Sequence, residues 1–366
     1  MSRNLPLAAA AIPLAALLFV ACGGTGSGTP KTTAVDTSAA AVQSGPDGRV
    51  IPQCVDLTTS PPPSKDFPPS ANPAANIPES QRNQVNLIVA GLDFYAGGEN
   101  NFVFAITNKQ DLPQGGAKVR VTIYDLKDPA KPAPYCQGGA IQSAPGVGPE
   151  RVHVHADGSN HTHGGQDQSR VAYYIRVKFS HAGGWGIAAE TILLDGTKGT
   201  ASVGFDVAAK PGIPAPGMPA LKSDNLTKKD VTKISEIDSG EPANDMHEVK
   251  IKDAIAAGRP LVIVFATPAF CTSRFCGPVT DEVATLNDKY KDKVDFVHIE
   301  IWRDFASKSV NTTAREWLIR PDGNLTEPYV YVIDKNGIIY DRFEGPAAAN
   351  LLEPEVQALI AGATYQ

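Results

Sequence analysis

The chain has 366 residues with 33 basic and 39 acidic side chains, which gives a formal net charge of −6 at pH 7. This acidic balance, together with the lack of any long Lys/Arg run, argues against nucleic acid or an anionic membrane surface as a partner bound through charge. The five cysteines are too few for a disulfide-dense mini-scaffold and lack the spacing of a four-cysteine zinc site. The 33 Gly and 30 Pro residues predict a long unstructured segment, β-rich domains with many turns, or both.

Residues 1–21 are predicted to be a secretory signal. Arg3 supplies a short positive region, and the apolar stretch that follows to Ala21 is too short for a transmembrane helix. The stretch ends in LFVAC and is followed by two glycines, which resembles a bacterial lipobox. The resemblance implies that Cys22 is acylated and anchors the chain in the lipid bilayer of the cell membrane. The chain would then face the extracytoplasmic side, where disulfides are allowed. The alternative is an ordinary signal peptide that contains a cysteine.

Residues 22–80 are rich in Gly, Ala, Ser, Thr and Pro and are predicted to be a disordered tether, because they cannot bury enough apolar surface to offset their backbone entropy. The more apolar stretch 50–57, which carries Cys54, is expected to dock on the domain that follows. Cys54 and Cys136 are expected to form a structural disulfide, because spare cysteines in an oxidising compartment most often pair. That bond would link the tether covalently to the β domain.

Residues 84–210 are predicted to form an all-β domain. Short segments rich in Val, Ile, Phe and Tyr alternate with Gly-containing turns, and this pattern favours an immunoglobulin-like sandwich. The stretch FSHAGGWGIAAETIL resembles extracytoplasmic YtkA- or FixH-like modules, in which a Gly-Trp turn precedes a strand. The resemblance implies that Trp185 is a core anchor.

Residues 211–245 are predicted to be a linker, and residues 246–366 a second domain. The apolar run at 261–265 predicts a buried parallel strand, and the later strand segments frame a hairpin turn at 334–337. The strings VIVFATPAFC and TEPYVYVIDKNGIIYDRFEG resemble thioredoxin-like proteins, which implies that Pro328 is a cis-proline that faces the cysteines and binds the substrate backbone. The predicted fold class is therefore two domains, an all-β immunoglobulin-like sandwich followed by an α/β thioredoxin-like fold, after a disordered N-terminal stalk.

Four residues separate Cys271 from Cys276, whereas thioredoxins carry Cys-x-x-Cys. Either cysteine could take the nucleophile position, but the six-residue step from Phe265 to Cys271, against eleven to Cys276, favours Cys271. Near a helix N-terminus its thiolate would be stabilised, so that it attacks a partner disulfide and Cys276 resolves the mixed disulfide. Arg274 would add positive potential, and Glu300 is a candidate proton relay. A static disulfide is the alternative.

A histidine-rich stretch, HVHADGSNHTHGG, contains four of the seven histidines: His153, His155, His161 and His163. Two His-x-His pairs on a polar loop could bind copper or zinc, and the alternative is a solvated loop indifferent to metals. Sco-type copper chaperones share the thioredoxin fold and combine two cysteines with a distal histidine, but their Cys-x-x-x-Cys spacing and histidine motif are absent. His298, in mid-strand, is interpreted as a core or edge residue, and His247 as an isolated neighbour of Met246.

These observations lead to three hypotheses. The leading one is a membrane-tethered extracytoplasmic thiol-disulfide oxidoreductase that requires no cofactor and acts on disulfide-bearing or dithiol proteins, with cytochrome c or cuproenzyme maturation as the candidate process. The second is a copper metallochaperone that uses the cysteine pair, the histidine-rich stretch, or both. The third is a non-catalytic interaction lipoprotein with a degenerate thioredoxin fold.

Overall fold

The structure is a computed structural model. It describes residues 49–57, 77–82, 84–146, 148–154, 160–165, 170–271, 273–304, 306–307 and 309–366. The predicted signal peptide and Cys22 lie outside these residues. Gln43–Gln366 form one compact unit. Within the described part of the chain, none of the helices has the length and apolar character needed to cross a bilayer.

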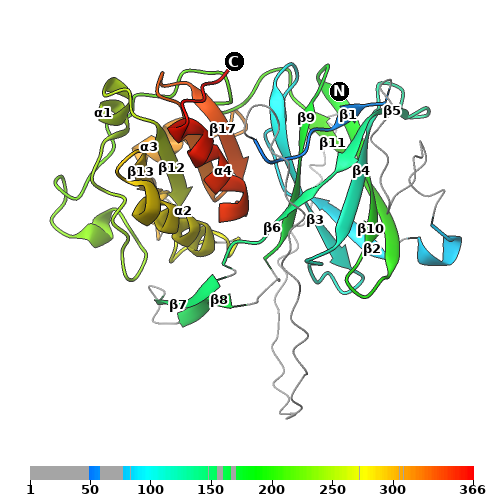
Figure 1. Ribbon diagram of the computed structural model, residues 1–366, viewed down its shortest axis with the longest axis horizontal. Coiled ribbons are helices and arrows are strands. Elements are labelled where there is room, and N and C mark those ends of the chain that lie inside the picture. Colours follow the sequence, from blue (N-terminus) through cyan, green and yellow to red (C-terminus); the bar gives the residue numbers. More distant parts are fainter. Residues whose placement is uncertain are drawn as a thin grey trace, which may run out of the picture. The chain divides into compact units, whose positions relative to one another are not determined.

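Two antiparallel sheets pack around one aromatic core (Figure 1). The first sheet has the order β1 (Val55–Asp56), β5 (Ala133–Gly139), β4 (Lys118–Asp125), β10 (Gly183–Ile192) and β11 (Lys198–Val207). The second has the order β2 (Val85–Val89), β3 (Glu99–Asn108), β9 (Ala172–Lys178) and β6 (Ile141–Ser143). Trp185 is fully buried in this core, and its ring centroid lies 5.1 Å from that of Phe179. Edge-to-face packing of this kind adds to the free energy of burying the two rings.

A separate two-stranded hairpin consists of β7 (Gly148–Val154) and β8 (Asn160–Gly165). It follows β6 along the chain and precedes β9.

A second body of structure is built on a four-stranded mixed sheet. Its order is β13 (Asp295–Glu300), β12 (Leu261–Ala266), β16 (Tyr329–Ile333) and β17 (Ile339–Glu344). Every residue of β12 is buried, as expected for a strand covered on both faces. One face packs against α2 (Cys276–Tyr290) and α4 (Ala349–Ile360), and the other against α1 (Ile251–Ala256) and α3 (Thr312–Leu318) (Figure 1). Short elements complete this part: η2 (Glu79–Gln81), η3 (Ile234–Glu236), β14 (Trp302–Asp304) and β15 (Ser309–Val310).

The two bodies share a core. Val103 and Tyr174, from the sheet that contains β3 and β9, belong to the same buried cluster as Val332 and Phe343. Two buried ion pairs also join the two bodies. Arg176 Nη2 lies 2.8 Å from Asp341 Oδ2, and Arg342 pairs with Asp93. Ion pairs in such surroundings are stable only while both partners remain, because a single buried charge is strongly disfavoured.

The predicted fold class is wrong. The chain is mostly β, with 35% strand and 17% helix, and it shows no clear α/β thioredoxin fold. The expected α/β organisation requires repeated parallel crossovers, whereas β12 and β13 are the one parallel pair of strands in the described residues. Residues 50–57, the stretch of the predicted tether that was expected to dock on the domain that follows, bury Val50, Ile51 and Cys54 and pair with β5 through β1. Apolar runs identified strands such as β12, but not how the strands pair.

Candidate redox site

Cys271 and Cys276 form a disulfide at the start of α2, with their Cα atoms 5.8 Å apart. The fully buried strand β12 ends at Ala266, and the loop that follows carries Cys271 to the first turn of the helix. Pro278 fits that first turn because proline lacks only an N–H that has no partner within the helix there. Cys271 is partly exposed, whereas Cys276 is completely buried.

The sulfur of Cys271 is held by the helix end. The backbone N–H of Cys276, the first residue of α2, donates a hydrogen bond to Cys271 Sγ over 3.2 Å. This is one of the N–H groups that a helix leaves without an internal partner. Ser273 Oγ also lies 3.2 Å from the sulfur and donates to the carbonyl oxygen of Glu327 at 3.0 Å. The cysteine loop is therefore tied to the residue before Pro328, and the Glu327–Pro328 peptide bond is cis.

Two charged side chains flank the cysteines. A carboxylate oxygen of Glu327 lies within 4.8 Å of both sulfur atoms, where a negative charge disfavours a thiolate. Arg274 is exposed and has a φ angle of 64°, in the left-handed region that non-glycine residues rarely adopt. Sequence reasoning singled out Arg274 but overlooked Glu327, although Glu327 directly precedes the proline it selected.

A cleft of about 370 Å³ opens beside this loop. It is lined by Ser273, Phe275, Trp302, Leu325, Thr326 and Glu327, together with Ala90, Glu344, Gly345 and Pro346. Its lining combines apolar side chains with the two acidic residues Glu327 and Glu344.

Glu300, the predicted proton relay, lies at the end of β13, where it pairs with Ala266. Its carboxylate accepts the backbone N–H of Ser239 at 2.8 Å. Burial raises the pKa of Glu300, although His298 acts in the opposite direction. The hydroxyl of Ser239 accepts the N–H of Ala269, so that this segment braces the cysteine loop.

The remaining cysteines, Cys54 and Cys136, form a disulfide with Cα atoms 5.4 Å apart. Both are buried, with 7% and 3% of their surface exposed, so partner proteins cannot reach them. The bond links the segment around β1 to β5, the strands that also pair with each other.

The histidine-rich stretch was expected to be a polar loop, but its described residues belong to strands β7 and β8 of a hairpin. The backbone register pairs His153 with His161 and Arg151 with His163. His155 lies outside the described residues. Metal binding by these histidines stays a prediction.

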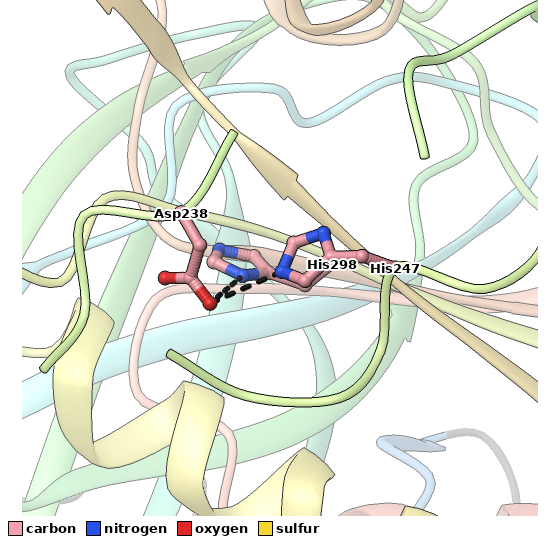
Figure 2. A group of neighbouring side chains, drawn as sticks. All are labelled: Asp238, His247 and His298. Atoms are coloured by element: carbon pink, nitrogen blue, oxygen red, sulfur yellow. Dashed lines mark hydrogen bonds and ion pairs between the residues drawn. The ribbon is translucent and has the colours of Figure 1, made fainter. Parts of the chain in front are cut away.

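A group that sequence reasoning missed is formed by Asp238, His247 and His298 (Figure 2). His298 is on β13, His247 precedes α1, and Asp238 follows η3. Burial alone would raise the pKa of Asp238, but the two imidazoles hold it well below its usual range. Burial lowers the pKa of His247, whereas for His298 the Asp238 carboxylate outweighs burial and raises the pKa. Asp238 therefore stabilises a positive charge on His298, whereas burial disfavours one on His247.

Comparisons with known proteins identify no family. No protein-family model matches the chain, and no curated protein matches it. Among solved structures, the chain is similar to that of AvmM, described as catalysing macrocyclization in alchivemycin A biosynthesis. The match covers 36% of this chain and 92% of that one, with 12% identity and a TM-score of 0.18. A similarity of this size supports no conclusion about fold or function.

Proposed function

We propose that the chain is a membrane-tethered extracytoplasmic thiol-disulfide oxidoreductase, with Cys271 as nucleophile and Cys276 as resolving thiol. The observation that carries this proposal is the hydrogen bond from the first N–H of α2 to Cys271 Sγ. A thiolate at this position gains that hydrogen bond and the positive end of the helix dipole, which lowers the pKa of the thiol.

The difference in burial assigns the two roles. Partly exposed Cys271 can meet a partner disulfide, and completely buried Cys276 can meet only Cys271. The Cys271 thiolate attacks one partner sulfur, forms a mixed disulfide and releases the other partner sulfur as a thiolate. The Cys276 thiolate then attacks Cys271, which closes the internal disulfide and releases the second partner thiol. Two electrons pass from the cysteine pair to the partner disulfide.

The cleft beside Ser273 and Glu327 would hold the partner as an extended segment. The partners that fit this chemistry are extracytoplasmic proteins with a disulfide or a dithiol, including those of cytochrome c or cuproenzyme maturation. Acylation of Cys22 would hold the chain at the membrane where such partners are matured.

Trapping of the mixed disulfide tests the proposal. The reduced Cys276→Ser variant, incubated with oxidised glutathione, should accumulate a glutathione adduct on Cys271 that mass spectrometry detects. The matched Cys271→Ser variant should stay unmodified, because Cys276 is buried. Reduction of insulin should be lost in both variants. Equal labelling of the two variants, or a reduction potential below about −300 mV, would instead assign a structural disulfide.

A second candidate function is binding of Cu(I) by the reduced pair. It is favoured by the grouping of the two sulfurs and the Glu327 carboxylate within 4.8 Å, because thiolates are the ligands that Cu(I) prefers. Titration of the reduced protein with Cu(I) separates the two functions. Tight binding that disappears in Cys271→Ser, without insulin reduction by the wild type, would support the metallochaperone.

A further inference from the structure

Three polar side chains from three different segments meet inside the protein. At most 2% of the surface of Asp238, His247 or His298 is exposed. Figure 2 shows that both imidazoles approach the same carboxylate oxygen of Asp238. Burial of three such groups together is costly unless each finds a strong partner.

The distances between the converging atoms suit a metal ion. Asp238 Oδ2 lies 3.1 Å from His247 Nε2 and 3.7 Å from His298 Nδ1. A tetrahedral Zn²⁺ with bonds of about 2.0–2.1 Å keeps its ligand atoms roughly 3.3–3.5 Å apart. The two observed distances lie on either side of this range, so small side-chain rotations would bring the atoms to ligand spacing.

Neighbouring hydrogen-bonding groups orient His298 and Asp238 in the way that such groups orient metal ligands in other proteins. Nε2 of His298 faces the carbonyl oxygen of Ala266 at 3.4 Å, and this contact leaves Nδ1 directed at Asp238. The second oxygen of Asp238, Oδ1, accepts the backbone N–H of Gly240 at 2.8 Å. Metal-binding histidines usually donate their other N–H to a backbone carbonyl, and ligating carboxylates are themselves hydrogen-bonded.

Asn244 marks the point where a cation would sit. Its Nδ2 donates to Asp238 Oδ2 at 2.8 Å and lies 2.9 Å from His298 Nδ1. An electropositive amide group thus lies between two of the converging atoms.

We infer that Asp238, His247 and His298 form a binding site for Zn²⁺. Two imidazole nitrogens and a carboxylate are ligands that zinc accepts, and the burial of all three side chains keeps the site away from bulk solvent. The ion would fasten the segment after η3 and the segment before α1 to the central sheet. Because Ser239 supports the cysteine loop through Ala269, the ion would also hold that loop in place. The inference does not depend on the proposed redox function.

Zinc titration of the full chain with its disulfides intact tests this inference. Oxidised cysteines cannot bind the metal, so the readout is independent of the redox pair. After treatment with a chelator, the wild type should bind one Zn²⁺ in calorimetry, and its Tm should rise. Loss of neighbours that only orient a ligand costs roughly 10–100-fold in affinity, so His247→Ala, which removes a ligand, should weaken binding by at least ~100-fold. Asn244→Ala removes the competing amide and should strengthen binding.

The matched control is the double variant His161→Ala/His163→Ala on β8, which should bind Zn²⁺ as the wild type does. If His247→Ala fails to fold, X-ray absorption of the zinc-loaded His161→Ala/His163→Ala double variant decides the question. Nitrogen and oxygen ligands without sulfur are expected. The inference is overturned if the wild type binds no zinc, if sulfur ligates it, or if only the β8 variant loses binding.

Discussion

Replacement of Glu327 by Gln should lower the pKa of the Cys271 thiol. The carboxylate oxygen lies within 4.8 Å of the sulfur. A unit charge at that distance contributes about 0.9 kcal/mol in water and about 3.5 kcal/mol at an effective dielectric constant of 20. These energies correspond to about 0.6 and 2.5 pKa units, and for this partly exposed site we expect a decrease of ~1 unit. The helix N–H remains in both proteins, so the change isolates the carboxylate.

The assay is the pH dependence of iodoacetamide alkylation in a Cys276→Ser background, in which Cys271 is the accessible thiol. In the chain that keeps Cys276, Glu327→Gln should also be the stronger oxidant, because a stabilised thiolate favours the reduced protein. Glu79→Gln, which removes a carboxylate exposed on η2, serves as the matched control and should leave the pKa unchanged. An unchanged or higher pKa in Glu327→Gln would refute the argument that this carboxylate opposes the thiolate.

Two further predictions concern stability. The double variant Cys54→Ser/Cys136→Ser removes a disulfide between residues 82 positions apart and should lower the free energy of unfolding, measured by urea denaturation, by roughly 4–5 kcal/mol. The double variant Cys271→Ser/Cys276→Ser removes a disulfide between residues 5 positions apart and should lower it by roughly half as much. Equal losses would contradict the loop-closure argument. Burial raises the pKa of Tyr95 to about 12, so the unfolded chain loses this proton first, near pH 10, and stability should decline between pH 10 and 12. Tyr95→Phe should show a shallower decline, and identical slopes would refute the assignment.

Local features of the redox site could be predicted from the sequence. The apolar run at 261–265 became β12, and the proline at position 278 indicated a helix start within a residue or two of the observed one. Glu327 was missed because its approach to the sulfurs depends on a loop that follows 51 residues after Cys276.

The buried group of Asp238, His247 and His298 illustrates the opposite case. His298 was interpreted as a core or edge residue and His247 as isolated, because neither has a ligand at short sequence spacing. A histidine within the apolar strand β13 was nevertheless a signal, since a buried polar side chain requires a partner. The partner, Asp238, comes from the segment predicted to be a linker, and no pattern within that segment identifies it.

The sequence by itself determined strands such as β12, several of the turns and the position of Cys271 just before a helix, because these depend on backbone sterics and on side-chain spacing over a few residues. Only the tertiary structure decided which strands pair, and it replaced the predicted fold class with a mostly β chain in which Gln43–Gln366 form one unit. The tertiary structure also brings Asp238, His247 and His298 together. Such contacts depend on the packing of many residues far apart in the chain, and no local pattern encodes them.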